Sequence, residues 1–301
     1  LGHVSCDAAG ERWVAEFTTD REPGTTWFYD HATGEAHILG RRNPDLDAGR
    51  LAAVRPFTVT ARDGLALPCH LTLPRGTPPR RLPTVLLVHG GPWYRDAAVY
   101  DPEVQFLADR GYAVLQVNFR GSTGYGKAFM QAAKGEFAGR MHDDLIDALD
   151  WAIAGGIADP DRVAIYGCSY GGYAALVGAS FTPDRFAAAI SYSGMSDLRA
   201  LVEGAVPLIR ETLVNSYIAY MGDPDIAAEN ADMLARSPVS RLDRIRCPLL
   251  VAHGAHDVRV ALSQAEAVVG ALRARGGAVE FLVNETEGHW FINPDSNHQL
   301  Y

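Results

Sequence analysis

Residues 162–180 read RVAIYGCSYGGYAALVGAS, and this stretch decides the fold of the chain. Its first part, 162–166, has the apolar, β-rich character of a buried strand. Its last part, 169–180, is a predicted helix rich in glycine and alanine. The motif G-x-S-x-G lies between them and centres on Ser169. A strand, a sharp turn and a helix in this order are the context of a nucleophile elbow, which presents a reactive serine.

The glycines of this motif have a physical role. A tight turn holds its serine in a strained backbone conformation, so side chains two residues away on either side would clash. A helix that begins at Ser169 also directs its free backbone N–H groups toward any anion formed there. The alternative is a glycine-rich turn that carries an ordinary surface serine.

Outside this stretch, strands alternate with helices. The two strands at 56–60 and 65–73 flank a turn, further strands are predicted at 84–88, 112–118, 186–191, 248–252 and 279–283, and helices at 102–110, 141–153 and 261–272. Alternation of this kind implies βαβ crossovers. It predicts an α/β fold with a mainly parallel sheet and helices on both faces.

The first 50 residues have a different pattern. Short β-like runs at 12–18, 26–30 and 35–39 are separated by turn signals, which predicts a small β-meander. Residues 41–49 are polar and contain Pro and Gly, as is typical of a linker. We therefore expect two parts: a meander with its linker over 1–50 and a catalytic domain over 51–301.

A serine hydroxyl is a weak nucleophile, so it needs a base and a group that orients the base. His289 follows the strand at 279–283 and precedes the terminal helix, where it can reach the elbow. Asp257 follows the strand at 248–252, one strand earlier. We predict a triad of Ser169, Asp257 and His289. The alternative for Asp257 is a helix N-cap.

A tetrahedral intermediate also needs two hydrogen-bond donors for its oxyanion. The backbone N–H of Tyr170, at the start of the helix, is the first candidate. The second comes from the loop His-Gly-Gly-Pro at 89–92, which follows a predicted strand and lets the backbone approach a substrate. Gly91 is the predicted donor, and a turn without a role is the alternative.

Four aromatic residues are candidates for substrate contacts. Trp93 and Tyr94 follow the glycine loop and either line the substrate cleft or pack against the meander. Phe119 and Tyr192 either line an apolar pocket or belong to the core.

Two further features have open interpretations. Arg120 either supports the site through charge-assisted hydrogen bonds or pairs with Asp143 or Asp144. The segment 201–236 is long and mostly helical. It either covers the site as a lid or forms a plain helical pair, which is the default.

Composition excludes several classes of function. The chain has 301 residues with 27 Lys and Arg against 36 Asp and Glu, a net charge of −9, and no basic block. Such a chain is a poor binder of nucleic acid and of anionic membranes. No apolar run approaches the roughly 20 residues needed to span a bilayer, so no membrane segment is expected.

The cysteines and histidines give no sign of a metal or a cofactor. The four cysteines form no C-x-x-C pair and have no zinc spacing, which predicts free thiols in a reducing compartment. His253 and His256 lack a third ligand at suitable spacing. We therefore expect no metal, no organic cofactor and a cytoplasmic location. A signal peptide is left open, because the chain begins at Leu1.

Together these motifs resemble the catalytic domain of the prolyl oligopeptidase family of serine peptidases, in its acylaminoacyl-peptidase and dipeptidyl-peptidase branch. The stretch NFRGSTGYG is the most specific, because generic esterases seldom carry it. The resemblance covers about residues 50 to 301. Its motifs are TARDG (60–64), HGGP (89–92), NFRGSTGYG (118–126), DD (143–144), GCSYGGY (167–173), DVRV (257–260) and EGH (287–289).

The resemblance implies an α/β-hydrolase fold preceded by a β-propeller that screens the active site. Residues 1–50 then resemble the last blade of that propeller, and the rest of the propeller and part of the terminal helix are expected outside this sequence. The expected function is a serine hydrolase that cleaves short peptides through an acyl-enzyme. The alternatives are a carboxylesterase for short acyl esters and a non-catalytic docking module. Whether the chain forms a homo-oligomer is left open.

Overall fold

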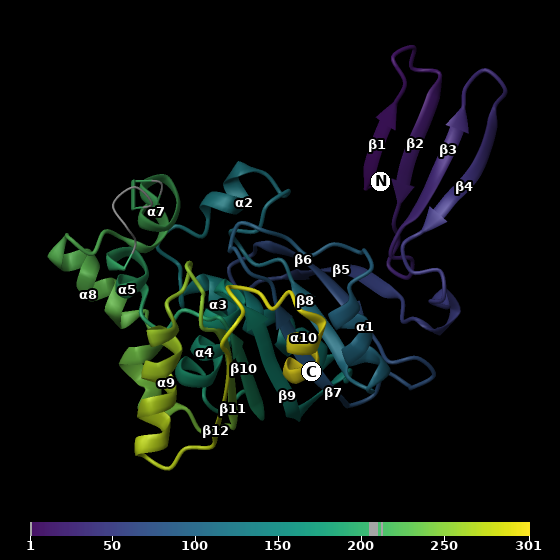
Figure 1. Cartoon of the computed structure of the whole chain (residues 1–301). Helices are drawn as coiled ribbons and strands as arrows, with labels where there is room; N and C mark the ends of the chain where they lie inside the picture. The colour runs from purple at the N-terminus through teal and green to yellow at the C-terminus, as the bar shows by residue number, and fades with distance from the viewer. Residues whose placement is uncertain (1, 205–209, 212) are drawn as a thin grey trace.

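The computed structural model describes residues 2–204, 210–211 and 213–301 (Figure 1). The strands are β1 His3–Cys6, β2 Arg12–Phe17, β3 Thr25–Asp30, β4 Glu35–Arg41, β5 Val54–Thr60, β6 Ala66–Thr72, β7 Leu82–Val88, β8 Ala113–Val117, β9 Ala158–Cys168, β10 Ala188–Tyr192, β11 Leu249–Gly254 and β12 Val279–Asn284. The helices are η1 Ala48–Arg50, α1 Pro102–Asp109, α2 Lys127–Gln131, α3 Arg140–Ala154, α4 Tyr170–Phe181, α5 Leu198–Glu203, η2 Val214–Ile218, α7 Ala219–Met221, α8 Ala227–Ala235, η3 Pro238–Arg244, α9 Leu262–Ala274 and α10 Pro294–Leu300.

The larger sheet has eight strands in the order β12-β11-β10-β9-β7-β8-β6-β5. The pairs β5–β6 and β6–β8 are antiparallel, and the other five pairs are parallel. Because parallel neighbours require crossovers, the helices between these strands pack on the sheet's faces. This is the α/β-hydrolase fold expected from the sequence.

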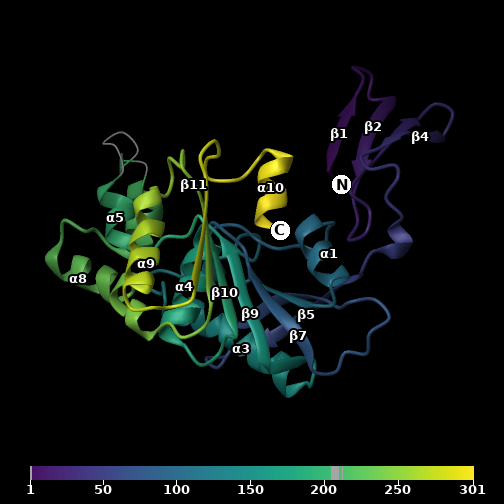
Figure 2. The same ribbon diagram turned by 60° about the horizontal axis from the view of Figure 1, so that its bottom comes forward.

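Helices cover both faces of this sheet (Figure 2). Side chains alternate along β7: Leu86 and Val88 face a core shared with α3, α4 and α9, whereas Val85 and Leu87 face a second core shared with α1 and α10. Successive strand residues point to opposite faces, so a run of apolar residues such as β7 is buried on both.

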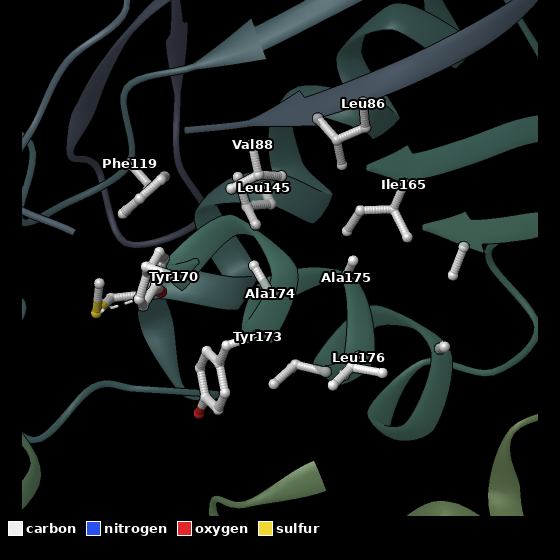
Figure 3. Packing of buried hydrophobic residues seen from close by; sticks show 14 of the residues in the cluster. Leu86, Val88, Phe119, Leu145, Ile165, Tyr170, Tyr173, Ala174, Ala175 and Leu176 are labelled. Atoms are coloured by element: carbon white, nitrogen blue, oxygen red, sulfur yellow. Dashed lines mark hydrogen bonds between the residues drawn. The ribbon is translucent and has the colours of Figure 1, made fainter. Parts of the chain in front are cut away.

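The helix α4 lies inside the first core (Figure 3). Every residue from Tyr170 to Ser180 is buried, which is the pattern of a helix without a solvent face. Tyr170 stacks on Phe119, with ring centroids 5.1 Å apart, and its hydroxyl contacts the sulfur of Met141. The small residues predicted for this helix let it approach the sheet closely.

Residues 3–41 form a separate four-stranded antiparallel sheet in the order β1-β2-β3-β4, which resembles a propeller blade (Figure 1). Three of these strands were predicted, but β1 was missed, so the expectation of three strands was wrong. This strand has only four residues and becomes evident only through its pairing with β2.

Gln105 of α1 joins the linker to the larger sheet. Its side chain accepts a hydrogen bond from the Ala52 amide and donates one to the Ala52 carbonyl, both at 2.9 Å. The carboxylate of Asp20 accepts a hydrogen bond from the Val54 amide, also at 2.9 Å. The chain therefore enters β5 in a defined position.

The segment 201–236 contains the end of α5, then η2, α7 and α8, but residues 205–209 and 212 of the predicted helical pair lie outside the described residues. The short helix α2 was not predicted. In the ranges that the structure covers, no helix combines the length and the apolar character that crossing a bilayer requires.

Candidate active site

Ser169 lies at the carboxyl end of β9, near the middle of the larger sheet. Its backbone has φ +60° and ψ −117°, a conformation that is strained for any residue with a side chain. Its amide donates a hydrogen bond of 2.9 Å to the carbonyl of Tyr192 in the neighbouring strand. The strand–turn–helix geometry predicted for the elbow is present.

Three glycines allow this turn to pack against its neighbours. A Cβ atom on Gly167 would lie 2.4 Å from the Val88 carbonyl oxygen, and one on Gly171 would lie 2.0 Å from the same atom. A Cβ on Gly172 would lie 2.7 Å from the Tyr192 carbonyl oxygen. These neighbours are backbone atoms of the sheet, which cannot move away without breaking its ladder.

Replacement of Gly171 by alanine is therefore expected to lower the free energy of unfolding by about 3 kcal/mol or more, because the added methyl group overlaps a fixed carbonyl. Gly270→Ala is the matched control: it lies inside α9 with no atom within 4 Å of its Cβ position. That change is expected to raise the free energy of unfolding by up to about 1 kcal/mol. Denaturant unfolding of both variants measures the difference, and equal stabilities would contradict the packing argument.

The glycine loop after β7 passes directly beside Ser169. A Cβ on Gly90 would lie 3.5 Å from the Ser169 Cβ, so these two backbones almost touch. Gly91 has φ +119°, which favours glycine. Tyr170 is the first residue of α4, and its amide has no acceptor within the helix. Both predicted oxyanion donors thus flank Ser169.

His89, the first residue of this loop, is fixed by contacts with neighbouring residues. Its ring stacks on Phe119 at a centroid distance of 4.5 Å, and its Nε2 lies 2.9 Å from the Ser122 hydroxyl. Burial lowers the pKa of His89 to about 4, so the ring is neutral at pH 7. It is a packing residue of the loop.

His289 and Asp257 meet at the carboxyl ends of β12 and β11. The His289 Nδ1 lies 2.7 Å from the Asp257 Oδ2, and both side chains are buried. A carboxylate accepts here, so Nδ1 carries the proton and Nε2 has the free lone pair that a base needs.

Asp257 is held by several donors. Its Oδ1 accepts hydrogen bonds from the amides of Arg259 and Val260 at 2.8 and 2.9 Å. Burial alone would raise the pKa of Asp257, but hydrogen bonds from His253, His289 and the Val260 amide together lower it below its usual value of 3.8. The carboxylate is therefore ionised at neutral pH.

A cavity of about 1150 Å³ opens at this edge of the sheet. Ser169 and Asp257 line it, and so do the predicted contacts Trp93 and Tyr94. The remaining lining residues come mainly from the helical segment and from the loops after β7, β10, β11 and β12: Gly90, Gly91, Cys168, Met195, Ala200, Leu201, Gly204, Leu213, Tyr217, Val258, Arg259, Val260, Ala261, Gln264 and Trp290.

Comparison with known proteins agrees with this geometry. A model of the prolyl oligopeptidase family matches residues 98–301. The chain belongs to the prolyl oligopeptidase family. Dipeptidyl aminopeptidase BIII of Pseudoxanthomonas mexicana is 42% identical over 95% of this chain and 42% of its own length. Dipeptidyl peptidase family member 6 of Caenorhabditis elegans is 32% identical over 98% of this chain and 43% of its own.

Solved structures of other peptidases have the same fold as this chain. The puromycin-hydrolyzing peptidase of Mycobacterium tuberculosis superposes with a TM-score of 0.88 and 29% identity, over 99% of this chain and 45% of that one. The chain thus spans less than half the length of the curated relatives it matches.

Within this prolyl oligopeptidase family domain, Phe119 and Tyr192 are core residues, so of the two interpretations left open by the sequence the structure supports the core and not the pocket. Phe119 is fully buried between His89 and Tyr170. Tyr192 is buried against Phe291 and accepts a hydrogen bond from its amide. Neither lines the cavity, because each side chain points into one of the two cores.

Arg120 likewise does not line the cavity, so it is not a candidate substrate contact. Its buried guanidinium donates to both oxygens of Asp144, at 2.7 and 2.8 Å, and to both oxygens of Asp63, at 2.9 and 3.1 Å. The alternative of an ion pair with Asp144 is the one observed. These four hydrogen bonds direct the guanidinium toward Asp144 of α3 and toward the turn before β6.

Arg259 and Glu287, which follow β11 and β12, have contacts that were not predicted from the sequence. Arg259 lines the cavity and lies over the Trp290 ring, 4.4 Å from its centroid, and no ion pair joins its guanidinium to any residue that the structure describes. Glu287 accepts hydrogen bonds from the amides of Ile292 and Asn293 at 3.0 and 2.8 Å, which lower its pKa. Arg259 lies in the motif DVRV and Glu287 in the motif EGH, but their contacts with Trp290 and with the amides of Ile292 and Asn293 become evident only in the folded structure.

Among the residues that the structure describes, no group of three or more His, Cys, Asp or Glu side chains is placed so that it could hold a metal ion. His253 is fully buried, and its Nε2 lies 2.8 Å from the Val260 carbonyl and 3.3 Å from the Asp257 Oδ2. His256, in contrast, is exposed. The two histidines flank the acid and do not converge.

Proposed function

We propose that this protein is a serine hydrolase that cleaves short peptides through an acyl-enzyme intermediate. The observation that carries the proposal is the 2.7 Å contact between His289 Nδ1 and Asp257 Oδ2, because Asp257 lines the same large cavity as the strained Ser169. A base held in one tautomer beside a nucleophile at a helix start is the arrangement that acyl transfer requires.

In the proposed reaction, the Ser169 oxygen attacks the substrate carbonyl carbon while His289 Nε2 takes the hydroxyl proton. The amides of Tyr170 and Gly91 donate to the oxyanion. His289 then gives the proton to the leaving amine as the C–N bond breaks. In the second step, water attacks the acyl-enzyme in the same way and releases the acid and free Ser169. Asp257 stabilises the His289 imidazolium in both steps.

The cavity supports a substrate with an apolar side chain beside the scissile bond. Its walls include Trp93, Met195, Leu201 and Tyr217. Arg259 offers guanidinium donors at the same cavity, which suits the carbonyl oxygens of a peptide backbone. The relatives named above as peptidases favour a peptide over an ester as the natural substrate.

A carboxylesterase is the competing function, because the same triad cleaves both bonds. We expect a dipeptide anilide with an apolar residue before the scissile bond to be hydrolysed with a kcat/KM within roughly 100-fold of the matching ester. Steady-state kinetics with both substrates on the full-length protein measures this ratio. Hydrolysis of the ester alone would contradict the peptidase proposal, and a folded protein that cleaves neither would favour a docking module.

Four further expectations belong to this proposal. Residues 1–50 and 51–301 are proposed as two units, supported by their separate sheets. Cytoplasmic location is supported by the free thiols of all four cysteines. A β-propeller outside this sequence and a homo-oligomer stay predictions.

A further inference from the structure

The carbonyl group of Gly91 has an unusual hydrogen-bond partner. The Tyr217 hydroxyl donates to this oxygen at 2.7 Å. Gly91 has no side chain to fix its conformation, and a Cβ there would lie 2.5 Å from the Trp93 amide nitrogen. This contact therefore supplies a restraint on Gly91 from outside the loop.

Tyr217 comes from a distant part of the chain. It lies in η2, a single π-helical turn in the segment before β11, a kind of turn that often occurs at functional sites. Its half-buried ring lines the cavity and meets the Trp93 ring edge-on at 5.0 Å. Burial raises the pKa of Tyr217, so the hydroxyl keeps its proton for Gly91.

We propose that Tyr217 is a positioning residue for the oxyanion loop, holding the Gly91 amide in the orientation that receives the oxyanion. This rests on the proposed function, in which Gly91 is the second donor. The hydroxyl acts on the backbone through the Gly91 carbonyl and does not touch the reacting atoms.

The placement links two parts of catalysis. One face of the Tyr217 ring belongs to the cavity wall that holds the substrate side chain, and its hydroxyl holds the oxyanion loop. A substrate that fills the cavity packs against the ring and keeps the hydroxyl on Gly91. Binding energy from the side chain is then used in the transition state, so poor filling lowers kcat as well as raising KM.

The test is Tyr217→Phe in the full-length protein, with Tyr220→Phe as the matched control. Both tyrosines meet the Trp93 ring edge-on at 5.0 Å, but no hydrogen bond of the Tyr220 hydroxyl is found among the described residues. We expect Tyr217→Phe to lower kcat roughly tenfold with KM within twofold. Tyr220→Phe should change neither. Melting temperatures of both variants are expected to stay within about 3 °C of the wild-type protein.

A second readout separates positioning from substrate packing. A peptide aldehyde forms a tetrahedral adduct with Ser169 and fills the oxyanion hole, whereas the corresponding peptide amide binds without an oxyanion. Tyr217→Phe should weaken the aldehyde by the same factor as kcat and leave amide binding within twofold. An unchanged kcat, or equal weakening of both ligands, would overturn this inference alone. An inactive wild-type protein that a fluorophosphonate does not label would overturn the proposed function as well.

Discussion

Replacement of Ser169 by alanine is expected to abolish covalent labelling by a fluorophosphonate and to lower the rate of peptide hydrolysis by about 10⁵ to 10⁶-fold. The hydroxyl is the only group in the proposed mechanism that forms the acyl bond, and its loss removes the function of the whole triad. Labelling is read by fluorescence after denaturing electrophoresis, and hydrolysis by release of the aniline from the peptide anilide.

Ser240→Ala is the control for this experiment. Ser240 is exposed and donates to the Ser237 carbonyl in η3, and it does not line the cavity. It should keep full labelling. If Ser169→Ala remains labelled with an unchanged melting temperature, another residue is the nucleophile and the proposed mechanism is wrong.

Replacement of Asp257 by asparagine is expected to lower kcat by about 10⁴-fold with little change in KM. The side-chain amide of asparagine carries no negative charge. It therefore no longer fixes the tautomer of His289 and no longer stabilises its imidazolium. Asp161→Asn is the matched control, because that side chain is 87% exposed and pairs only with Arg81 at 3.8 Å. Single-turnover kinetics measures the acylation step in both variants.

The same variant has a predicted pH signature. The folded state lowers the pKa of Asp257, so its ionised form stabilises the fold above pH 3.8, and this contribution is lost as the pH falls through the folded pKa. Asp257→Asn lacks this contribution. Its free energy of unfolding should therefore fall less than that of the wild-type protein between pH 7 and pH 3. Parallel curves would contradict the assigned direction of the shift.

The elbow was predictable from the sequence because its determinants are local. Gly167, Ser169 and Gly171 lie within five residues, and both the strand before them and the helix after them have clear patterns. Asp257 and His289 were found because each follows a predicted strand, and parallel strands end at one edge. Their 2.7 Å contact agrees with that topology.

The contacts that escaped prediction depend on tertiary packing. Phe119 and Tyr192 are apolar residues at strand ends, and the sequence alone does not reveal whether such a side chain points into a cavity or into the core. The hydrogen bond from Tyr217 to Gly91 joins residues 126 positions apart in the chain, so no local sequence pattern predicts it. Strand β1 was missed for the same reason, since a four-residue strand is specified by its partner.

His289 follows β12, which forms one edge of the larger sheet and pairs only with β11. None of the residues of β12 is fully buried. Edge elements with few buried contacts open at a lower free energy than a protein's central strands. The base is thus attached to one of the more easily detached parts of the domain, whereas Ser169 is attached to a central strand. Partial detachment of this edge would remove His289 from the site while the core stays folded, so we expect heat or denaturant to abolish the proposed activity before the domain unfolds.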